Sequence, residues 1–272
     1  MTYTPALPLS GYAGWKFLKR TYATQTRAFA ASTELKRDED YFRAKIGSVK
    51  TAEQLVSDRR LLKVALGAYG LDSDINNKFF LRKILEDGTL KTAALANRLA
   101  DKQYRAFSSG FGFGDYSVPR TQLSDFADKT IAAYKTRAFE TAVGDQNNDL
   151  RLALNAEREL PAVAGRTMAE ATKWFTVMGN TPLRQMFEKA LNLPTSIGAL
   201  DLDRQLRIFQ DKTAQIFGTN SVSQFAEPKQ MDALVRRFLL QSEAQASGVA
   251  QSASAGALLM LESAANFARG LR

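Results

Sequence analysis

Amphipathic helical periodicity runs through almost the whole sequence, and it restricts the fold more than any other feature. Apolar residues recur at intervals of three and four between recognisable helix starts and stops. In the stretch from Thr51 to Gly70, for example, Thr51 and Gln54 fit a capping box, and Gly70 fits a helix stop. No run of β-branched residues alternates with polar ones in the way that strands require. The pattern therefore predicts an all-α, multihelical fold.

Residues 1–9 contain Pro5 and Pro8, and they are expected to form an extended, mobile N-terminal lead. A helix is expected from Gly11, and the helices after it are expected at 38–46, 51–69, 72–87, 121–143, 148–160, 167–178, 182–191, 198–217, 228–246 and 249–270, with two shorter ones within 89–107.

The clearest interruption lies at residues 109–120, where three glycines stand at alternate positions and few helix-forming residues occur. We interpret it as a Gly-rich linker loop, or as a loop packed through Phe111 and Phe113. It would separate an N-terminal helical half, residues 10–108, from a C-terminal helical half, residues 121–272.

Two phrases of the sequence are alike, RLLKVALGAYGL at 60–71 and PLRQMFEKALNL at 182–193. Matching positions stand at a constant spacing of 122 residues, as from Leu61 to Leu183, and the likeness continues into the following helix. A helix pair of this kind cannot bury both of its apolar faces alone, so two packed copies would form a core. An internal duplication explains the likeness, and so does chance similarity between two amphipathic hairpins. The fold prediction therefore includes two similar halves as a possibility.

The chain contains no Cys and no His. Disulfides, thiolate nucleophiles, zinc fingers, and every triad or proton relay that needs an imidazole are therefore excluded. An enzyme would have to use carboxylates, Lys, Tyr, Ser or a metal held by oxygen atoms. We therefore expect a protein that is not an enzyme and has no cofactor.

Two short motifs resemble ligand sites but lack the required spacing. The GFGFG of residues 110–114 does not follow a strand and does not have the spacing of a dinucleotide loop. Asp145, Asn147 and Asp149 match the first positions of a calcium loop, but the glycine and the bidentate glutamate that should follow are missing. A turn and a helix N-cap are the simpler interpretations.

Two pairs of acids are also interpreted as structural. Asp201 and Asp203 stand two residues apart, as do Glu157 and Glu159, and side chains with this spacing diverge on a helix. Acids in the first turn of a helix are expected from the helix dipole. We therefore predict no metal site and no catalytic residue.

The net charge of +9 indicates an acidic partner, an anionic lipid surface or nucleic acid. Arg59, Arg60, Lys229, Arg236 and Arg237 either contact phosphates or lie on solvated helix faces. No sequence signature of a DNA- or RNA-binding module is present. A basic nucleic-acid-binding regulator remains the alternative function.

The two ends of the chain carry apolar stripes at helical spacing. The first has four aromatic residues spaced three, seven and seven apart from Tyr12, and the second runs along 249–270 with mostly small residues. These amphipathic terminal helices either bury each other within one molecule or contact a partner. The residues predicted for a partner contact are Trp15, Tyr22, Met260 and Phe267.

Several phrases in order resemble the bacterial domain-of-unknown-function family 1217, over residues 9–270. They are LSGYAGWKFLKRTY, YFRAKIGSV, the Ala-Tyr-Gly-Leu of 68–71, NDLRLALNAEREL, GNTPLRQMFEKALNLP, LDLDRQLRIF and LVRRFLLQSEAQ. The resemblance implies a multihelical protein of alphaproteobacteria whose gene often lies beside flagellar genes. Some members are labelled as flagellar or basal-body rod-like proteins, although this chain lacks the β-rich middle and the Asn-rich N-terminal signature of true rod proteins.

The resemblance gives the expected function, a non-enzymatic helical interaction protein associated with flagellar structure or assembly. The expected partner is a flagellar protein or a second copy of the chain. No segment has the apolar length of a membrane span, and the first residues do not fit a Sec-type signal peptide. The expected location is the cytoplasm, or the flagellum after export by another route.

Overall fold

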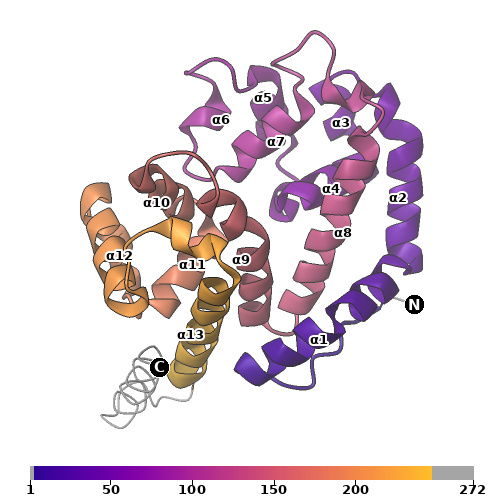
Figure 1. Ribbon diagram of the computed structural model, residues 1–272. Helices are drawn as coiled ribbons and strands as arrows, with labels where there is room; N and C mark the ends of the chain where they lie inside the picture. Colours follow the sequence, from indigo (N-terminus) through magenta and orange to yellow (C-terminus); the bar gives the residue numbers. More distant parts are fainter. Residues whose placement is uncertain (1–2, 247–272) are drawn as a thin grey trace.

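The computed structural model describes residues 3–246, and within this range every element of regular secondary structure is a helix. The predicted all-α, multihelical fold is therefore confirmed (Figure 1). The α-helices are α1 (Gly11–Ala30), α2 (Thr33–Lys45), α3 (Ala52–Ser57), α4 (Arg59–Tyr69), α5 (Lys78–Asp87), α6 (Leu95–Arg98), α7 (Gln103–Phe111), α8 (Phe126–Gly144), α9 (Asn148–Ala164), α10 (Glu170–Met178), α11 (Thr181–Ala190), α12 (Leu202–Phe217) and α13 (Pro228–Ala246). Short 3₁₀ helices are η1 (Ile46–Ser48), η2 (Asp72–Asp74), η3 (Arg120–Gln122), η4 (Thr195–Ala199) and η5 (Val222–Ala226).

The helices α8 and α9 form an antiparallel pair at the centre of the molecule (Figure 1). The helix α4 packs on α8, and α2 packs outside it, whereas α11 and α13 pack on α9. The N-terminal helix α1 contacts α8, α9 and α13, so it bridges the two sides. The buried apolar side chains form one continuous cluster that includes both tryptophans, Trp15 and Trp174. A single core thus spans the two predicted halves.

The helix expected at 51–69 is divided in two at Asp58. The predicted capping box is present, because Gln54 N–H donates to the Thr51 hydroxyl and the Gln54 side chain accepts from Thr51 N–H. The carboxylate of Asp58 accepts hydrogen bonds from the backbone of Arg60 and Leu61, so it caps a new helix, α4. Periodicity does not detect this break, because the apolar spacing continues across it.

The two similar phrases fold into the same local structure. Asp58 caps α4 and Asn180 caps α11, each by accepting a hydrogen bond from the N–H three residues later. After each helix the backbone turns through a left-handed residue, Gly70 with φ 73° and Asn192 with φ 53°. A 3₁₀ turn and another helix follow in both cases. The two units pack on different central helices, and an origin by duplication stays a prediction.

The N-terminal lead lies against α1 from Tyr3 onward. The side chain of Gln25 accepts a hydrogen bond from Ala6 N–H at 2.7 Å and donates one to Ala6 O at 3.1 Å. Gln146, at the α8–α9 turn, donates to Pro5 O at 2.8 Å, and the ring of Tyr3 lies 6.4 Å from that of Phe29. The extended backbone expected here is therefore docked, because three polar contacts and one aromatic contact hold it.

The segment at 109–120 is also packed rather than open. Its first residues complete α7, and the side chain of Phe111 is fully buried with its ring 5.1 Å from that of Phe126. The ring of Phe113 stacks on Phe111 at 5.7 Å. Of the two interpretations of this segment, the geometry agrees with a loop packed through these two aromatic residues.

We expect the α4–α8 contact to tolerate no added atom at Gly67. A Cβ there would lie 2.7 Å from the Tyr134 ring and 3.1 Å from the Asp72 carboxylate. The Gly67→Ala change gains about 1 kcal/mol in helix propensity, but overpacking of a core costs about 1 to 3 kcal/mol. Urea denaturation should show the free energy of unfolding lowered by up to about 2 kcal/mol.

The matched control is Gly47→Ala, because a Cβ at that position meets nothing within 4 Å. Its effect should stay within about 0.5 kcal/mol. Equal effects of the two substitutions would contradict the tight α4–α8 packing.

Candidate interaction surface

The aromatic stripe of α1 is used inside the fold. Trp15 is 1% exposed, and the ring of Tyr22 packs edge-on against Phe139 of α8 at 5.5 Å. Trp15 therefore has no free surface for a partner in this conformation, and Tyr22 is partly buried. The other two predicted contact residues, Met260 and Phe267, lie outside the described residues.

The polar edge of α1 is tied to the C-terminal half by ion pairs. Lys16 Nζ lies 2.9 Å from the Asp232 carboxylate, which also accepts a hydrogen bond from the Tyr12 hydroxyl. Lys19 Nζ lies 2.5 Å from the carboxylate of Glu157 on α9. These pairs are exposed and contribute little stability individually. Their geometry nevertheless agrees with a helix that packs within its own molecule.

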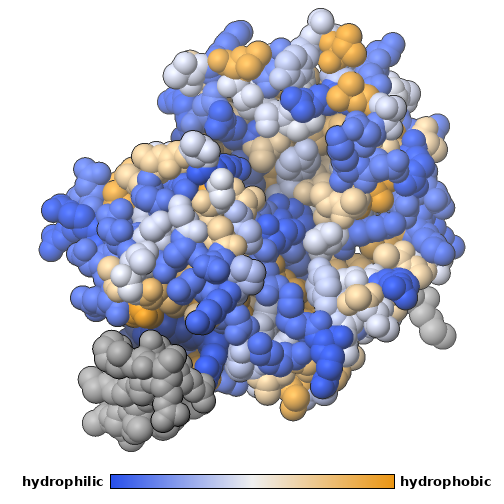
Figure 2. Space-filling model, viewed as in Figure 1, coloured by the Kyte–Doolittle hydropathy of each residue, from blue (hydrophilic) through white to orange (hydrophobic). Residues whose placement is uncertain are grey.

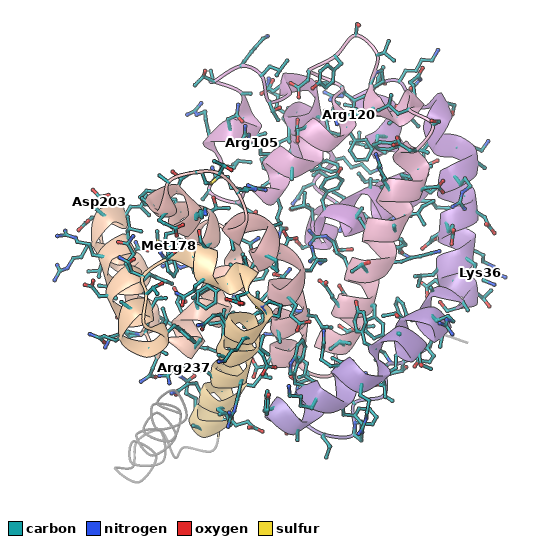
Figure 3. The ribbon with its side chains drawn as sticks, viewed as in Figure 1. Lys36, Arg105, Arg120, Met178, Asp203 and Arg237 are labelled. Carbon is teal, nitrogen blue, oxygen red and sulfur yellow. The ribbon has the colours of Figure 1, made fainter. Side chains whose placement is uncertain are left out.

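Most residues of the apparent calcium loop and of the two acidic pairs serve as caps or ion-pair partners. Asn147 accepts the Leu150 N–H, and Asp201 accepts the Arg204 N–H, so both are N-caps. Asp203 lies on the outer helix α12, at the left edge of the view (Figure 3). Among residues 3–246 no group of three or more acids is placed to hold a metal ion.

The basic residues considered for phosphate contacts mostly have partners within the chain. Arg59 donates to the Asn76 side chain, and the Arg60 guanidinium lies 3.9 Å above the Tyr41 ring while donating to Arg37 O. Arg237 donates to Ala190 O. The Arg236 guanidinium lies 5.7 Å from the Tyr12 ring, and Lys229 is exposed at the start of α13.

An open depression of about 500 Å³ lies between α2, α4 and η2. It is lined by Asp38, Arg59, Arg60, Lys63, Leu66, Asp72 and Ile75. Within it Lys63 Nζ binds the carboxylates of Asp38 at 2.8 Å and Glu34 at 3.1 Å, and the Tyr134 hydroxyl donates to Asp38 at 3.0 Å.

The central lysine and tyrosine of this ion-pair network are unsuited to act as bases. Partial burial opposes the charge on Lys63, but its bonds to Asp38 and Glu34 outweigh burial and raise its pKa. Burial and the charge of Asp38 raise the pKa of Tyr134. The amine therefore stays protonated and the phenol stays neutral, so neither Lys63 nor Tyr134 is a free base.

A Lys–Ser pair in the C-terminal half resembles a nucleophile with its base, but its hydrogen bonds run in the wrong direction for that role. Lys173 is buried, and its ammonium donates to Ala164 O at 2.9 Å and to the Ser223 hydroxyl at 2.5 Å. Its carboxylate partner, Glu170, lies 3.2 Å away and also accepts a hydrogen bond from Ser223. A lysine that activates a serine must accept the hydroxyl proton, whereas Lys173 donates to Ser223 and the Ser223 hydroxyl donates to Glu170. The cluster joins α10 to η5 and has a structural role.

The hydrogen bonds to Glu170 should make the free energy of unfolding depend on pH in the acidic range. Partial burial raises the pKa of the Glu170 carboxyl, but bonds from Ser223, Ser221, Lys173 and Val222 N–H outweigh this and lower it to about 2, from 4.5. A lowered folded-state pKa stabilises the fold above pH 4.5, and this stabilisation is lost as the pH falls toward 2. Since a third of the side chain is exposed, we expect about 1 to 2 kcal/mol.

Urea denaturation of the wild type and Glu170→Gln at several pH values measures this contribution. Near neutral pH the wild type should have a larger free energy of unfolding than Glu170→Gln. This difference between the two proteins should become smaller as the pH falls below 4.5. Glu227→Gln, on an exposed turn before α13, controls for the loss of a surface carboxylate. A difference for Glu170→Gln that is constant with pH would contradict the assignment.

Large apolar side chains are exposed on two neighbouring loops, which we call the double loop, residues 88–94 and 112–119. Leu90 is 70% exposed, Val118 61% and Tyr116 46%. Figure 2 shows apolar groups at the corresponding upper end of the molecule, above α5 and α7. Helical periodicity does not identify them, because they lie between helices. The signal in the sequence is large apolar residues among helix-breaking ones.

The double loop is held rigidly by one carboxylate and by close backbone contact. Asp115 accepts hydrogen bonds from Thr89 N–H at 2.6 Å, Leu90 N–H at 3.1 Å and the Thr89 hydroxyl at 2.8 Å. Gly88 has φ 68°, and a Cβ there would meet the Asp115 carboxylate at 2.2 Å. A Cβ at Gly114 would lie 2.3 Å from Glu86 O. Gly88 and Gly114, the last residue of the GFGFG motif, thus allow the two loops to contact each other.

No helix within residues 3–246 is both long and apolar enough to cross a membrane. The prediction that the chain has no membrane span therefore agrees with the structure for this range.

The fold is similar to that of a solved bacterial protein. The crystal structure of protein AGR_C_984 from Agrobacterium tumefaciens superposes with a TM-score of 0.70 at 25% sequence identity, covering 89% of this chain and 99% of that one. A search of the curated proteins finds no match.

The sequence profile of the family described as "Protein of unknown function (DUF1217)" matches residues 68–231, which is more than half of the chain. This range includes the end of the first similar phrase, all of the second, the double loop and the central helices α8 and α9. The family resemblance noted in the sequence is thereby confirmed, and the chain belongs to the DUF1217 family.

Proposed function

We propose that this chain is a non-enzymatic helical interaction protein that takes part in flagellar structure or assembly. The observation that carries the proposal is the double loop, where Leu90, Tyr116 and Val118 are exposed on a backbone held by Asp115. Its partner would be a flagellar protein.

Exposed apolar groups on a rigid backbone suit a binding surface for two physical reasons. Covering apolar surface gains roughly 25 cal/mol per Å² removed from water. A backbone already fixed in one conformation loses little further entropy when a partner binds. Binding residues are often placed on loops that a rigid scaffold positions.

The side chains best suited to catalysis support the non-enzymatic part of the proposal by their contacts. Lys63 is held between two carboxylates, and Lys173 donates to a carbonyl, a hydroxyl and a carboxylate. Both residues stabilise packing between helices. The polar chemistry of this chain is thus used inside the fold, whereas its exposed loops present apolar groups.

The flagellar part of the proposal is supported by the family resemblance, because genes of this family often lie beside flagellar genes. Both expected locations, the cytoplasm and the flagellum after non-Sec export, are compatible with it.

Deleting the gene in a flagellated host and measuring swimming and flagellar number tests the proposal. We expect reduced motility, restored by the wild-type gene, and recovery of a tagged copy with isolated flagella or with a flagellar assembly protein. A fully motile deletion strain without any flagellar partner would contradict it.

The nucleic-acid alternative is separated by titrating the purified protein with DNA and RNA at several salt concentrations. Counterion release gives specific and non-specific nucleic-acid complexes a steep loss of affinity with salt. We expect no such complex. Salt-sensitive binding would favour the regulator instead.

A further inference from the structure

We propose that the double loop binds a segment of a partner protein that combines apolar with acidic side chains. The inference rests on the proposed function and names the chemistry of the partner. It follows from the apolar side chains of the double loop together with the charge around them.

The two loops that carry the apolar side chains are joined by hydrogen bonds. Leu90 N–H donates to the Asp115 carboxylate, and Tyr116 is the next residue after Asp115 in the chain. Val118 follows two residues later and is anchored by the buried Pro119. Three large side chains thus stand on two touching loops, which is the form of a small anchoring site for an apolar side chain of a partner.

The charge around this site is positive. Between residues 78 and 125 the sequence has eight Lys and Arg but five Asp and Glu. Lys91 is exposed beside Leu90. The guanidinium of Arg120 lies 5.3 Å from the centre of the Tyr116 ring and donates to its hydroxyl at 3.3 Å, at the upper end of the molecule (Figure 3).

The acidic side chains near the double loop have hydrogen-bond or ion-pair partners within the chain. Asp115 accepts the three hydrogen bonds that hold the loops, and the contact with Lys83 lowers the pKa of Asp87. Glu86 lies 3.6 Å from Arg82. A partner therefore meets apolar side chains flanked by Lys91 and Arg120, which attract carboxylates.

The same charges argue against a second copy of this chain as the occupant. In a symmetric dimer through the double loop, each patch would face its own copy. Lys91 and Arg120 of one molecule would then approach the same cations of the other, and like charges facing across an interface disfavour association.

Selection of a phage-displayed library of random peptides on the wild-type protein tests the inference. We expect enriched peptides to combine Leu, Phe or Trp with Asp or Glu. Binding of the best peptide, measured by fluorescence polarisation, should weaken about tenfold or more in two double variants. Leu90→Ser/Val118→Ser removes apolar surface that the peptide would cover, and Lys91→Glu/Arg120→Glu reverses the charge that attracts its acidic side chains. Binding should also weaken as salt increases.

The matched control is Leu202→Ser, since Leu202 is 54% exposed at the start of α12 in the other half. This variant should bind like the wild type, and circular dichroism should show that all variants are folded. Enriched peptides without acids, or affinity that neither double variant changes, would overturn the proposal. A wild-type dimer dissociated by Leu90→Ser/Val118→Ser would also overturn it in favour of self-association.

The outcomes are separable from those of the proposed function. A motile deletion strain together with selected acidic peptides would remove the flagellar role but leave the site. Loss of motility without acidic peptides would leave the role but move the contact elsewhere.

Discussion

The contact between α8 and α9 is the interaction on which the rest of the structure depends, because α1, α2 and α4 pack on α8 and α1, α10, α11 and α13 pack on α9. Its core is apolar, and one ion-pair network crosses it. The Arg158 guanidinium contacts Glu140 through two hydrogen bonds of 2.6 and 2.9 Å, and Arg137 pairs with Glu159 at 2.8 Å. Glu140 is buried, so removing Arg158 would leave a buried carboxylate without its counterion, which is destabilising.

This central pair explains why two similar helical units form one body. The unit that contains α4 packs on α8, and the unit that contains α11 packs on α9, so each buries an apolar face that it cannot bury alone. The helix α1 then covers the junction from the outside, with Trp15 buried and Lys16 and Lys19 paired to the C-terminal half. The aromatic stripe of α1, which the sequence suggested as a partner contact, therefore packs within the molecule at this junction.

The sequence predicted the helices well and their surroundings poorly, for physical reasons. Periodicity and capping are local, so the Thr51 capping box and the stop at Gly70 could be predicted from neighbouring residues. The docking of the lead depends on Gln25 and Gln146, which are distant from it in the chain. Likewise, whether Trp15 meets a partner or the core depends on the surface opposite it.

The double loop is a second example of a structure that depends on contacts between residues distant in the sequence. Its glycines could be identified in the sequence. Their role in allowing two loops to contact each other depends on the hydrogen bonds from Thr89 and Leu90 to Asp115, which the sequence does not predict. A charged pocket and a Lys–Ser pair are formed by residues that periodicity places only on helix faces. In both places the amines are bound to acceptors within the chain, which leaves the apolar loops as the part of the described surface best suited to recognition.

The two tryptophans offer the most direct test of a single core built on α8 and α9. Trp15 lies on α1 and Trp174 on α10, and both are buried in the one apolar cluster. Urea denaturation of Trp15→Phe and of Trp174→Phe, followed by fluorescence and by circular dichroism, monitors each remaining tryptophan against the whole fold. A single core predicts that fluorescence and circular dichroism give the same midpoint within each variant. A tryptophan that reports a separate transition would contradict it and indicate two independent halves.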